Sequence, residues 1–181
     1  MTPVLDFVGE PRAFLAQARA SIESLQEGGL LPGTRSTALL TAAFDNLLRG
    51  LFARAAADGA LSPSAATHGV CLVAVGVYAR RELCPHSDLD LVLLHDGASE
   101  PALAVLAERV LYPLWNDGMQ VGQAVGTVAE LLASADGDPK RQNALLDLRF
   151  LAGSSALFVA LGGATGGAVI LNAQTNTQSV E

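Results

Sequence analysis

Apolar residues recur at intervals of three and four positions in the first third of the chain, and this spacing predicts two helices. The first begins at Pro11, a favoured first helical residue, and ends at the glycine pair 28–29. The second covers about Thr34–Asp58 and ends before Gly59. Each helix carries one apolar stripe, so each is expected to pack one face against a core.

Uncharged runs rich in β-branched residues predict buried strands in the middle of the chain. Three strands are expected, near residues 69–77, 89–95 and 119–126. Between the second and the third, the apolar spacing becomes helical again. It predicts a helix that is N-capped by Ser99 and ends near Gly118.

Two more helices are predicted after the third strand. Thr127 and Glu130 have the spacing of a capping box, which predicts a helix over about 128–133. The next helix is expected over about Pro139–Leu151, after a turn rich in aspartate and glycine.

These elements predict an α/β fold in which a small mixed sheet is flanked by helices. The expected organisation is an N-terminal helical segment over 1–33, the α/β domain over 34–160 and a disordered or unrelated tail over 161–181. The stretch Leu151–Leu171 is uncharged and long enough to span a bilayer, but its five glycines argue against insertion. No membrane association is therefore expected.

Composition narrows the class of protein. Half of the 181 residues are hydrophobic, as in a globular domain, and the formal net charge of −7 argues against nucleic-acid binding. Neither Cys71 nor Cys84 has metal-site spacing, and Cys71 is expected to be a small core residue, which fits a reducing cytoplasm. The lone His68 is expected to be exposed. The N-terminus lacks the basic region and apolar core of a secretory signal.

Candidate chemistry lies at the start of the second predicted strand. Asp88 and Asp90 are two residues apart, and side chains at that spacing in a strand point to the same face. Paired carboxylates suit Mg²⁺, which proteins hold with one or two carboxylates together with substrate phosphates. The alternative interpretation is a solvated turn, which is the commoner setting for such a pair.

Nearby residues favour a nucleoside triphosphate site over a turn. Gly76 ends the first strand and allows close backbone approach to a ligand. Arg80 and Arg81 supply cations for phosphate oxygens, and Ser87 offers a hydroxyl directly before Asp88. Together with the two carboxylates, these residues are predicted to bind a triphosphate and its metal ion.

The segment Gly76–Leu91 resembles the signature of the nucleotidyltransferase domain of bacterial PII uridylyltransferases, members of the DNA polymerase beta-like superfamily. Two further segments, Leu111–Gly118 and Ala144–Phe158, are similar to later helices of that domain. The resemblance implies transfer of UMP from UTP to a tyrosine of the PII nitrogen-signalling protein. It also implies that Asp88 and Asp90 bind Mg²⁺ at the catalytic centre, while Gly76, Arg80 and Ser87 contact the nucleotide.

The chain departs from the family pattern at several places. Val77 and Ala79 replace glycines, which is expected to weaken the phosphate cradle. The stretch Gly122–Thr127 lacks the family's histidine and arginine, and no third carboxylate is present over 119–128, although Asp117 lies just before it. Three hypotheses stay open: an active uridylyltransferase domain, an inactive remnant that binds nucleotide or a partner, and another nucleotidyltransferase of the superfamily.

Overall fold

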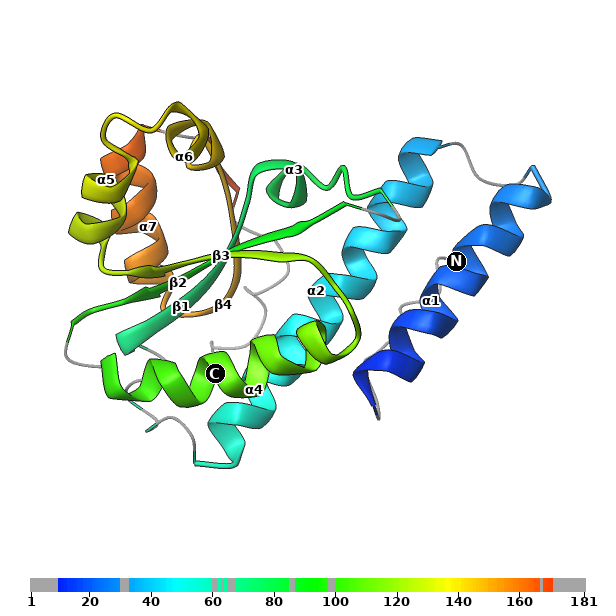
Figure 1. Cartoon of the computed structure of the whole chain (residues 1–181), viewed down its shortest axis with the longest axis horizontal. Helices are drawn as coiled ribbons and strands as arrows, with labels where there is room; N and C mark the ends of the chain where they lie inside the picture. The colour runs from blue at the N-terminus through cyan, green and yellow to red at the C-terminus, as the bar shows by residue number, and fades with distance from the viewer. Residues whose placement is uncertain are drawn as a thin grey trace, which may run out of the picture.

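A computed structural model shows helices on both faces of one sheet (Figure 1). It describes residues 10–29, 33–59, 62, 64, 68–84, 87–97, 100–166 and 168–170. Within these residues the sheet has five strands in the order β3-β2-β1-β4-β5. Their bounds are β1 Val70–Val75, β2 Leu89–His95, β3 Val121–Gly126, β4 Asp147–Gly153 and β5 Ala168–Ile170. The predicted α/β class with a mixed sheet is confirmed.

The sheet is mixed because its central strand is antiparallel to both neighbours. β1 pairs antiparallel with β2 and with β4, whereas β3 runs parallel to β2 and β5 parallel to β4. Every residue of β1 is buried, as expected for a strand covered by helices on both faces. Cys71 lies on this strand, and burial raises the pKa of its thiol to about 12, as the expectation of a core cysteine requires.

Three long helices lie on one side of the sheet. They are α1 Pro11–Glu27, α2 Gly33–Ala57 and α4 Glu100–Asn116, all close to their predicted bounds. α2 and α4 cover the face of the sheet, and α1 packs on these two helices. Apolar residues of these helices and alternate residues of β1 and β2, among them Leu72 and Leu91, belong to the larger of two cores. The cap predicted at Ser99 lies outside the described residues.

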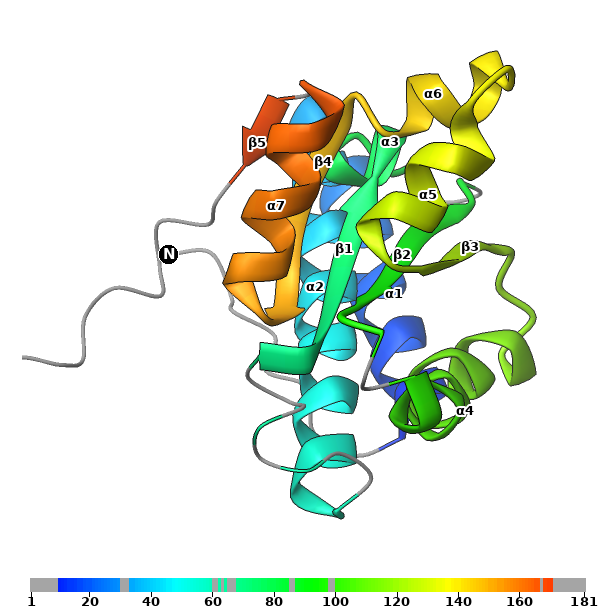
Figure 2. The same ribbon diagram turned by 90° about the vertical axis from the view of Figure 1, so that its left-hand side faces the viewer.

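The other face carries α5 Val128–Ala135, α6 Pro139–Ala144 and α7 Ser155–Thr165 (Figure 2). The predicted capping box is present: the Thr127 hydroxyl accepts from the Glu130 amide, and the Glu130 side chain accepts from the Thr127 amide. These helices enclose a second, smaller core that includes Val73, Val92 and Phe158. The sheet therefore separates the two cores.

The prediction of one strand over 69–77 was too long. β1 ends at Val75, and Gly76 begins the single-turn helix α3, Gly76–Ala79. Gly76 has a φ of +59°, in the left-handed region that residues with a Cβ rarely adopt. The chain therefore turns sharply at this glycine, at the end of the central strand.

The prediction of one helix over Pro139–Leu151 was wrong. α6 stops at Ala144, and Asp147–Gly153 forms β4 beside the central strand. A short apolar run fits a helical stripe as well as a buried strand, and here pairing with β1 decides the outcome.

The C-terminal boundary also moves. α7 continues to Thr165, and β5 pairs with β4, so the structured region extends beyond the predicted limit at residue 160. Residues 171–181 of the expected tail lie outside the described residues. Among the helices that the structure describes, none has both the length and the hydropathy needed to cross a bilayer.

Candidate functional site

Asp88 and Asp90 lie at the beginning of β2, next to the end of the central strand. Asp90 is half-buried and Asp88 is exposed. The two alternate with Leu89 and Leu91, whose side chains fill the core under α2 and α4. By that alternation both carboxylates belong to the face that carries α5, α6 and α7.

The Asp90 carboxylate is held between two glycines. In the parallel register of β2 and β3, Asp90 is the partner of Gly122, and a Cβ at Gly122 would come within 2.3 Å of Asp90 Oδ1. A Cβ at Gly76 would lie 3.7 Å from Asp90 Oδ2. Glycine on each side thus leaves room for this carboxylate, and the structure brings the predicted Gly76 and Asp90 together.

The charges around Asp90 do not fully neutralise its carboxylate. Its pKa is raised, first by burial and second by the negative charge of Asp88, while Lys140 acts in the opposite direction. A bound divalent cation stabilises a carboxylate whose pKa is raised by a second carboxylate beside it. The donor set and the space that Gly122 leaves beside Asp90 therefore fit Mg²⁺.

The described residues place no third carboxylate beside Asp88 and Asp90 to complete a metal site. Within the described part of the chain, no group of three or more His, Cys, Asp or Glu side chains is placed to hold a metal ion. Substrate phosphates supply the remaining oxygen ligands in many magnesium sites, so two carboxylates are still a sufficient protein contribution.

A cleft of about 670 Å³ opens beside Asp90. Its floor is formed by β2 and β3, and its wall by α5 and α6, which stand together over these strands in Figure 2. Lys140 and Arg141 of α6 line it together with Gln123 of β3. Its volume is within the range of small-ligand sites.

Lys140 and Arg141 were not predicted as site residues. Arg141 forms an ion pair with Asp138 at 3.2 Å, whereas no ion pair of Lys140 is found among the described residues. Lys140 is the only lysine of the chain. Its sequence position, 50 residues after Asp90 and inside a wrongly predicted helix, gave no indication that α6 faces the aspartate pair.

Ser87 is held in a tight turn before β2. Its hydroxyl accepts from the Cys84 amide at 3.0 Å, and its own amide donates to the Cys84 carbonyl at 3.0 Å. The Ser87 hydroxyl accepts a hydrogen bond in this turn, so its own proton can still be donated to another group. A phosphate contact from Ser87 stays a prediction.

Arg80 is engaged with protein carboxylates. Its Nη1 donates to Asp147 at 2.5 Å and its Nε to Glu82 at 2.9 Å, and these hydrogen bonds, first the one to Asp147, raise the pKa of Arg80. The proposed phosphate contact of Arg80 stays a prediction, and it has to compete with these two bonds.

Val77 and Ala79, which stand where the family has glycines, have different environments. Val77 is exposed, but Ala79 is fully buried in the larger core. The expected weakening of the phosphate cradle by these two side chains stays a prediction.

Gly126 stands where the family has an arginine, and it lies four residues along β3 from Gly122, the partner of Asp90. A Cβ there would come within 3.3 Å of Glu130 Oε2, at the capping box of α5. An arginine at this position would face Glu130. Its absence removes an ion-pair partner of Glu130 at α5.

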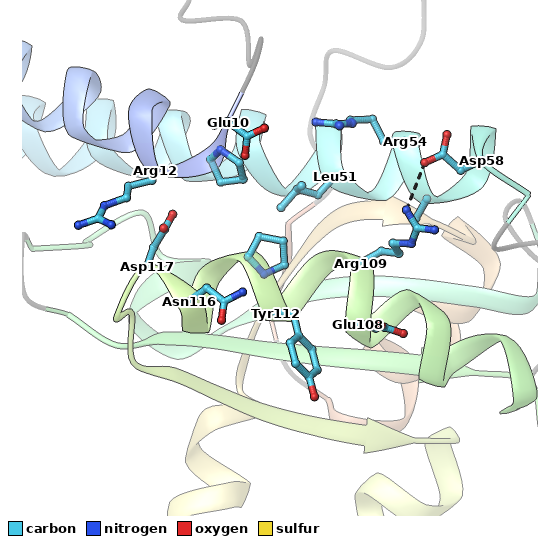
Figure 3. A pocket seen from close by; sticks show the side chains of 13 residues that line it. Glu10, Arg12, Leu51, Arg54, Asp58, Glu108, Arg109, Tyr112, Asn116 and Asp117 are labelled. Atoms are coloured by element: carbon cyan, nitrogen blue, oxygen red, sulfur yellow. Dashed lines mark hydrogen bonds and ion pairs between the residues drawn. The ribbon is translucent and has the colours of Figure 1, made fainter.

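Asp117 lines a different cleft, of about 520 Å³, between α1, α2 and α4 (Figure 3). Figure 3 shows it near Arg12 and Asn116, with the Arg109–Asp58 ion pair of 3.5 Å farther along. The helices of this cleft cover the opposite face of the sheet from α5 and α6. The structure thus does not bring Asp117 into the cleft beside Asp90.

Comparison with known proteins gives a consistent set of relatives, although no family model matches the chain. A bifunctional uridylyltransferase/uridylyl-removing enzyme of Streptomyces coelicolor is 41% identical over 146 residues, which cover 80% of this chain and 16% of the relative. The enzyme of the same name from Gluconobacter oxydans is 35% identical over 146 residues, or 81% of this chain and 15% of the relative. The Mycobacterium tuberculosis enzyme is 42% identical over 93 residues, or 51% of this chain and 12% of the relative. The chain thus spans less than a fifth of the length of these relatives.

Proposed function

Over most of its length the chain is a homologue of the bifunctional uridylyltransferase/uridylyl-removing enzymes, and from this relationship we propose that its aspartate pair serves nucleotidyl transfer. The reaction proposed is transfer of UMP from UTP to a tyrosine hydroxyl of a PII signal protein. The name of the relatives supports the uridylyl group. The PII acceptor follows from the resemblance of Gly76–Leu91 to the family signature.

The observation that carries this proposal is the placement of Asp90 between Gly76 and Gly122, beside the cleft lined by Lys140. Asp88 and Asp90 would hold Mg²⁺, which supplies charge neutralisation for the triphosphate when bound. Lys140, on the cleft wall, would contact phosphate oxygens. The cleft over β2 and β3 would take the nucleotide.

In this reaction the acceptor oxygen forms a bond to the α-phosphorus of UTP, and the bond from that phosphorus to the β-phosphate oxygen breaks. Pyrophosphate leaves, and the acceptor hydroxyl gives up its proton to solvent water. The protein contributes mainly position and charge: the glycines keep the Asp90 carboxylate in place, and Lys140 offsets the negative charge of the reacting phosphates.

A second candidate is a domain that binds nucleotide without turning it over. It is favoured by the absence of a third carboxylate near Asp90 among the described residues. In that case UTP would bind in a Mg²⁺-dependent manner without transfer.

Calorimetry with UTP, followed by an assay with UTP, Mg²⁺ and a PII protein, distinguishes the two candidates. Intact mass of PII reports the added nucleotide. We expect binding that requires Mg²⁺ and is lost in the Asp88→Ala, Asp90→Ala double variant. The control variant is Asp58→Ala, which removes a carboxylate from the cleft on the opposite face. Equal binding by the double variant would contradict both candidates, and binding without modification of PII would favour the second.

A further inference from the structure

A buried charged network lies behind the turn that begins at Gly76. Arg149 of β4 is completely buried, and its NH1 donates to Asp45 Oδ2 of α2 at 2.5 Å. The Tyr78 hydroxyl of α3 donates to the other oxygen of Asp45 at 2.8 Å. The guanidinium also lies over the Tyr78 ring, 5.0 Å from its centroid. Three elements far apart in sequence thus meet at one carboxylate.

Arg149 holds the backbone of the turn directly. Its Nε donates to the Ala79 carbonyl at 3.0 Å and its NH2 to the Tyr78 carbonyl at 2.9 Å. The last carbonyls of a helix have no partner within the helix, and α3 is only one turn long. Arg149 therefore supplies a donor to the Ala79 carbonyl and a second donor to the Tyr78 carbonyl, which also accepts from the Arg81 amide at 3.2 Å.

The turn needs such support because its backbone is strained at Arg81, whereas Gly76 adopts a positive φ without strain. Gly76 has a φ of +59° and Arg81 a φ of +64°. A left-handed conformation costs a non-glycine residue about 1 kcal/mol or more, and it persists when the surrounding structure holds it. Asp147, two residues before Arg149 on β4, adds a second attachment through Arg80.

The same turn borders the candidate site, since a Cβ at Gly76 would contact Asp90 Oδ2. A shift of the turn would therefore change the space beside this carboxylate. Small displacements of groups that position a substrate have large effects on rate, about 100-fold for 1 Å.

We propose that Arg149, neutralised by Asp45, is a positioning residue that fixes the Gly76–Arg81 turn beside the Asp90 carboxylate for nucleotide binding. The consequence for nucleotide rests on the proposed function, whereas the fixing of the turn does not. Arg149 acts through the turn, because its polar atoms are engaged by Asp45 and by the two carbonyls.

The test must remove the network without leaving a buried charge. Truncating one partner of a buried ion pair typically costs about 3–5 kcal/mol, whereas replacing the whole pair by apolar residues of similar volume is often neutral. The test variant is therefore Asp45→Leu, Tyr78→Phe, Arg149→Met, which keeps the volume and removes every polar side chain of the network. The control is Arg49→Gln, since Arg49 also contacts Asp45, at 3.7 Å, but donates to Leu151 instead of the turn.

Hydrogen exchange of the amides of residues 80–82 measures the turn itself, because all three donate to carbonyls within it. We expect about tenfold faster exchange there in the triple variant, the effect of losing one or two hydrogen bonds, and no change in β2. Mg²⁺-dependent UTP affinity should fall by about tenfold or more. The single variant Arg149→Lys keeps the charge but not the forked contacts, so it should show the same local change in a well-folded chain.

The outcomes separate the two claims. Wild-type exchange at residues 80–82 in the triple variant and in Arg149→Lys would overturn the proposal. So would faster exchange with unchanged UTP affinity, since the turn would then not serve the site. If the wild-type chain binds no UTP, the proposed function fails, and the exchange measurement alone decides whether Arg149 fixes the turn.

Discussion

Asp90 and Gly122 are partners in the parallel register of β2 and β3, and the carboxylate of one occupies the place where the other would carry a side chain. The 2.3 Å from a Cβ at Gly122 to Asp90 Oδ1 is shorter than any ordinary contact. This pairing explains why an edge strand with four exposed residues includes a glycine at that position. The glycine leaves room for the carboxylate.

The first prediction is that Gly122→Ala displaces the Asp90 carboxylate and abolishes Mg²⁺-dependent UTP binding. The added methyl group meets a carboxylate that is attached to a paired strand and can escape only by rotating away. Isothermal calorimetry measures the loss. The matched control is Gly163→Ala, the same change at a glycine with nothing within 4 Å. Wild-type affinity in Gly122→Ala would contradict the placement of the metal at Asp90.

The second prediction concerns the pH dependence of stability. The pKa of Asp90 is raised in the folded chain, mainly by burial and then by Asp88. The folded chain therefore keeps this proton to higher pH than the unfolded chain, and the free energy of unfolding falls as pH rises through the interval between the two pKa values. Asp90→Asn removes this penalty, so the variant should have a higher melting temperature at pH 7 in the absence of metal. The gain should disappear below the unfolded pKa.

In the presence of Mg²⁺, the wild type should have a higher melting temperature than Asp90→Asn. A ligand that binds only the folded state stabilises it, so Mg²⁺ is expected to raise the melting temperature of the wild type and not of Asp90→Asn. Thermal unfolding at several pH values, with Mg²⁺ or with EDTA, measures both effects. Equal responses of the two chains to Mg²⁺ would exclude Asp90 as a ligand.

The hydrophobic pattern predicted most of this fold because most elements carry their own signals. α1 begins at a proline, and α5 has its capping box within four consecutive residues. β4 had no such signal. Its residues Asp147–Gly153 fit a helical stripe, and only the pairing with β1 makes them a strand. Information of this kind lies in the partner strand and is absent from the segment itself.

Some residues of the candidate site were likewise predictable from the sequence, and others were not. Asp88 and Asp90 were predictable because a two-residue spacing on a strand determines a shared face. Lys140 and Arg149 were not, since both lie in the segment that was predicted as one helix over Pro139–Leu151. Lys140 lines the cleft, and Arg149 contacts the turn beside it. Arg149 did carry one signal: a charged residue within an apolar strand requires a partner when buried, and Asp45 provides it.

The last prediction is that Lys140 contacts the triphosphate. Lys140 lines the cleft beside Asp90 and opposes part of the rise in the pKa of that carboxylate, so its ammonium group acts on the site where the phosphates would lie. Lys140→Met should weaken UTP binding by about tenfold, the size of one charge-assisted hydrogen bond, and Lys140→Arg should restore most of it. The control is Arg109→Met, in the cleft on the opposite face.

Because Lys140 is the only lysine, its reactivity gives an independent measurement. An amine-reactive reagent should label the chain at Lys140 and at the N-terminus, and Mg²⁺ with UTP should slow labelling at Lys140 alone. Peptide mass spectrometry separates the two positions. Unchanged labelling of Lys140 at UTP concentrations that saturate the calorimetric signal would show that the triphosphate lies elsewhere, and would leave the neighbouring Arg141 as the cation to test on this wall of the cleft.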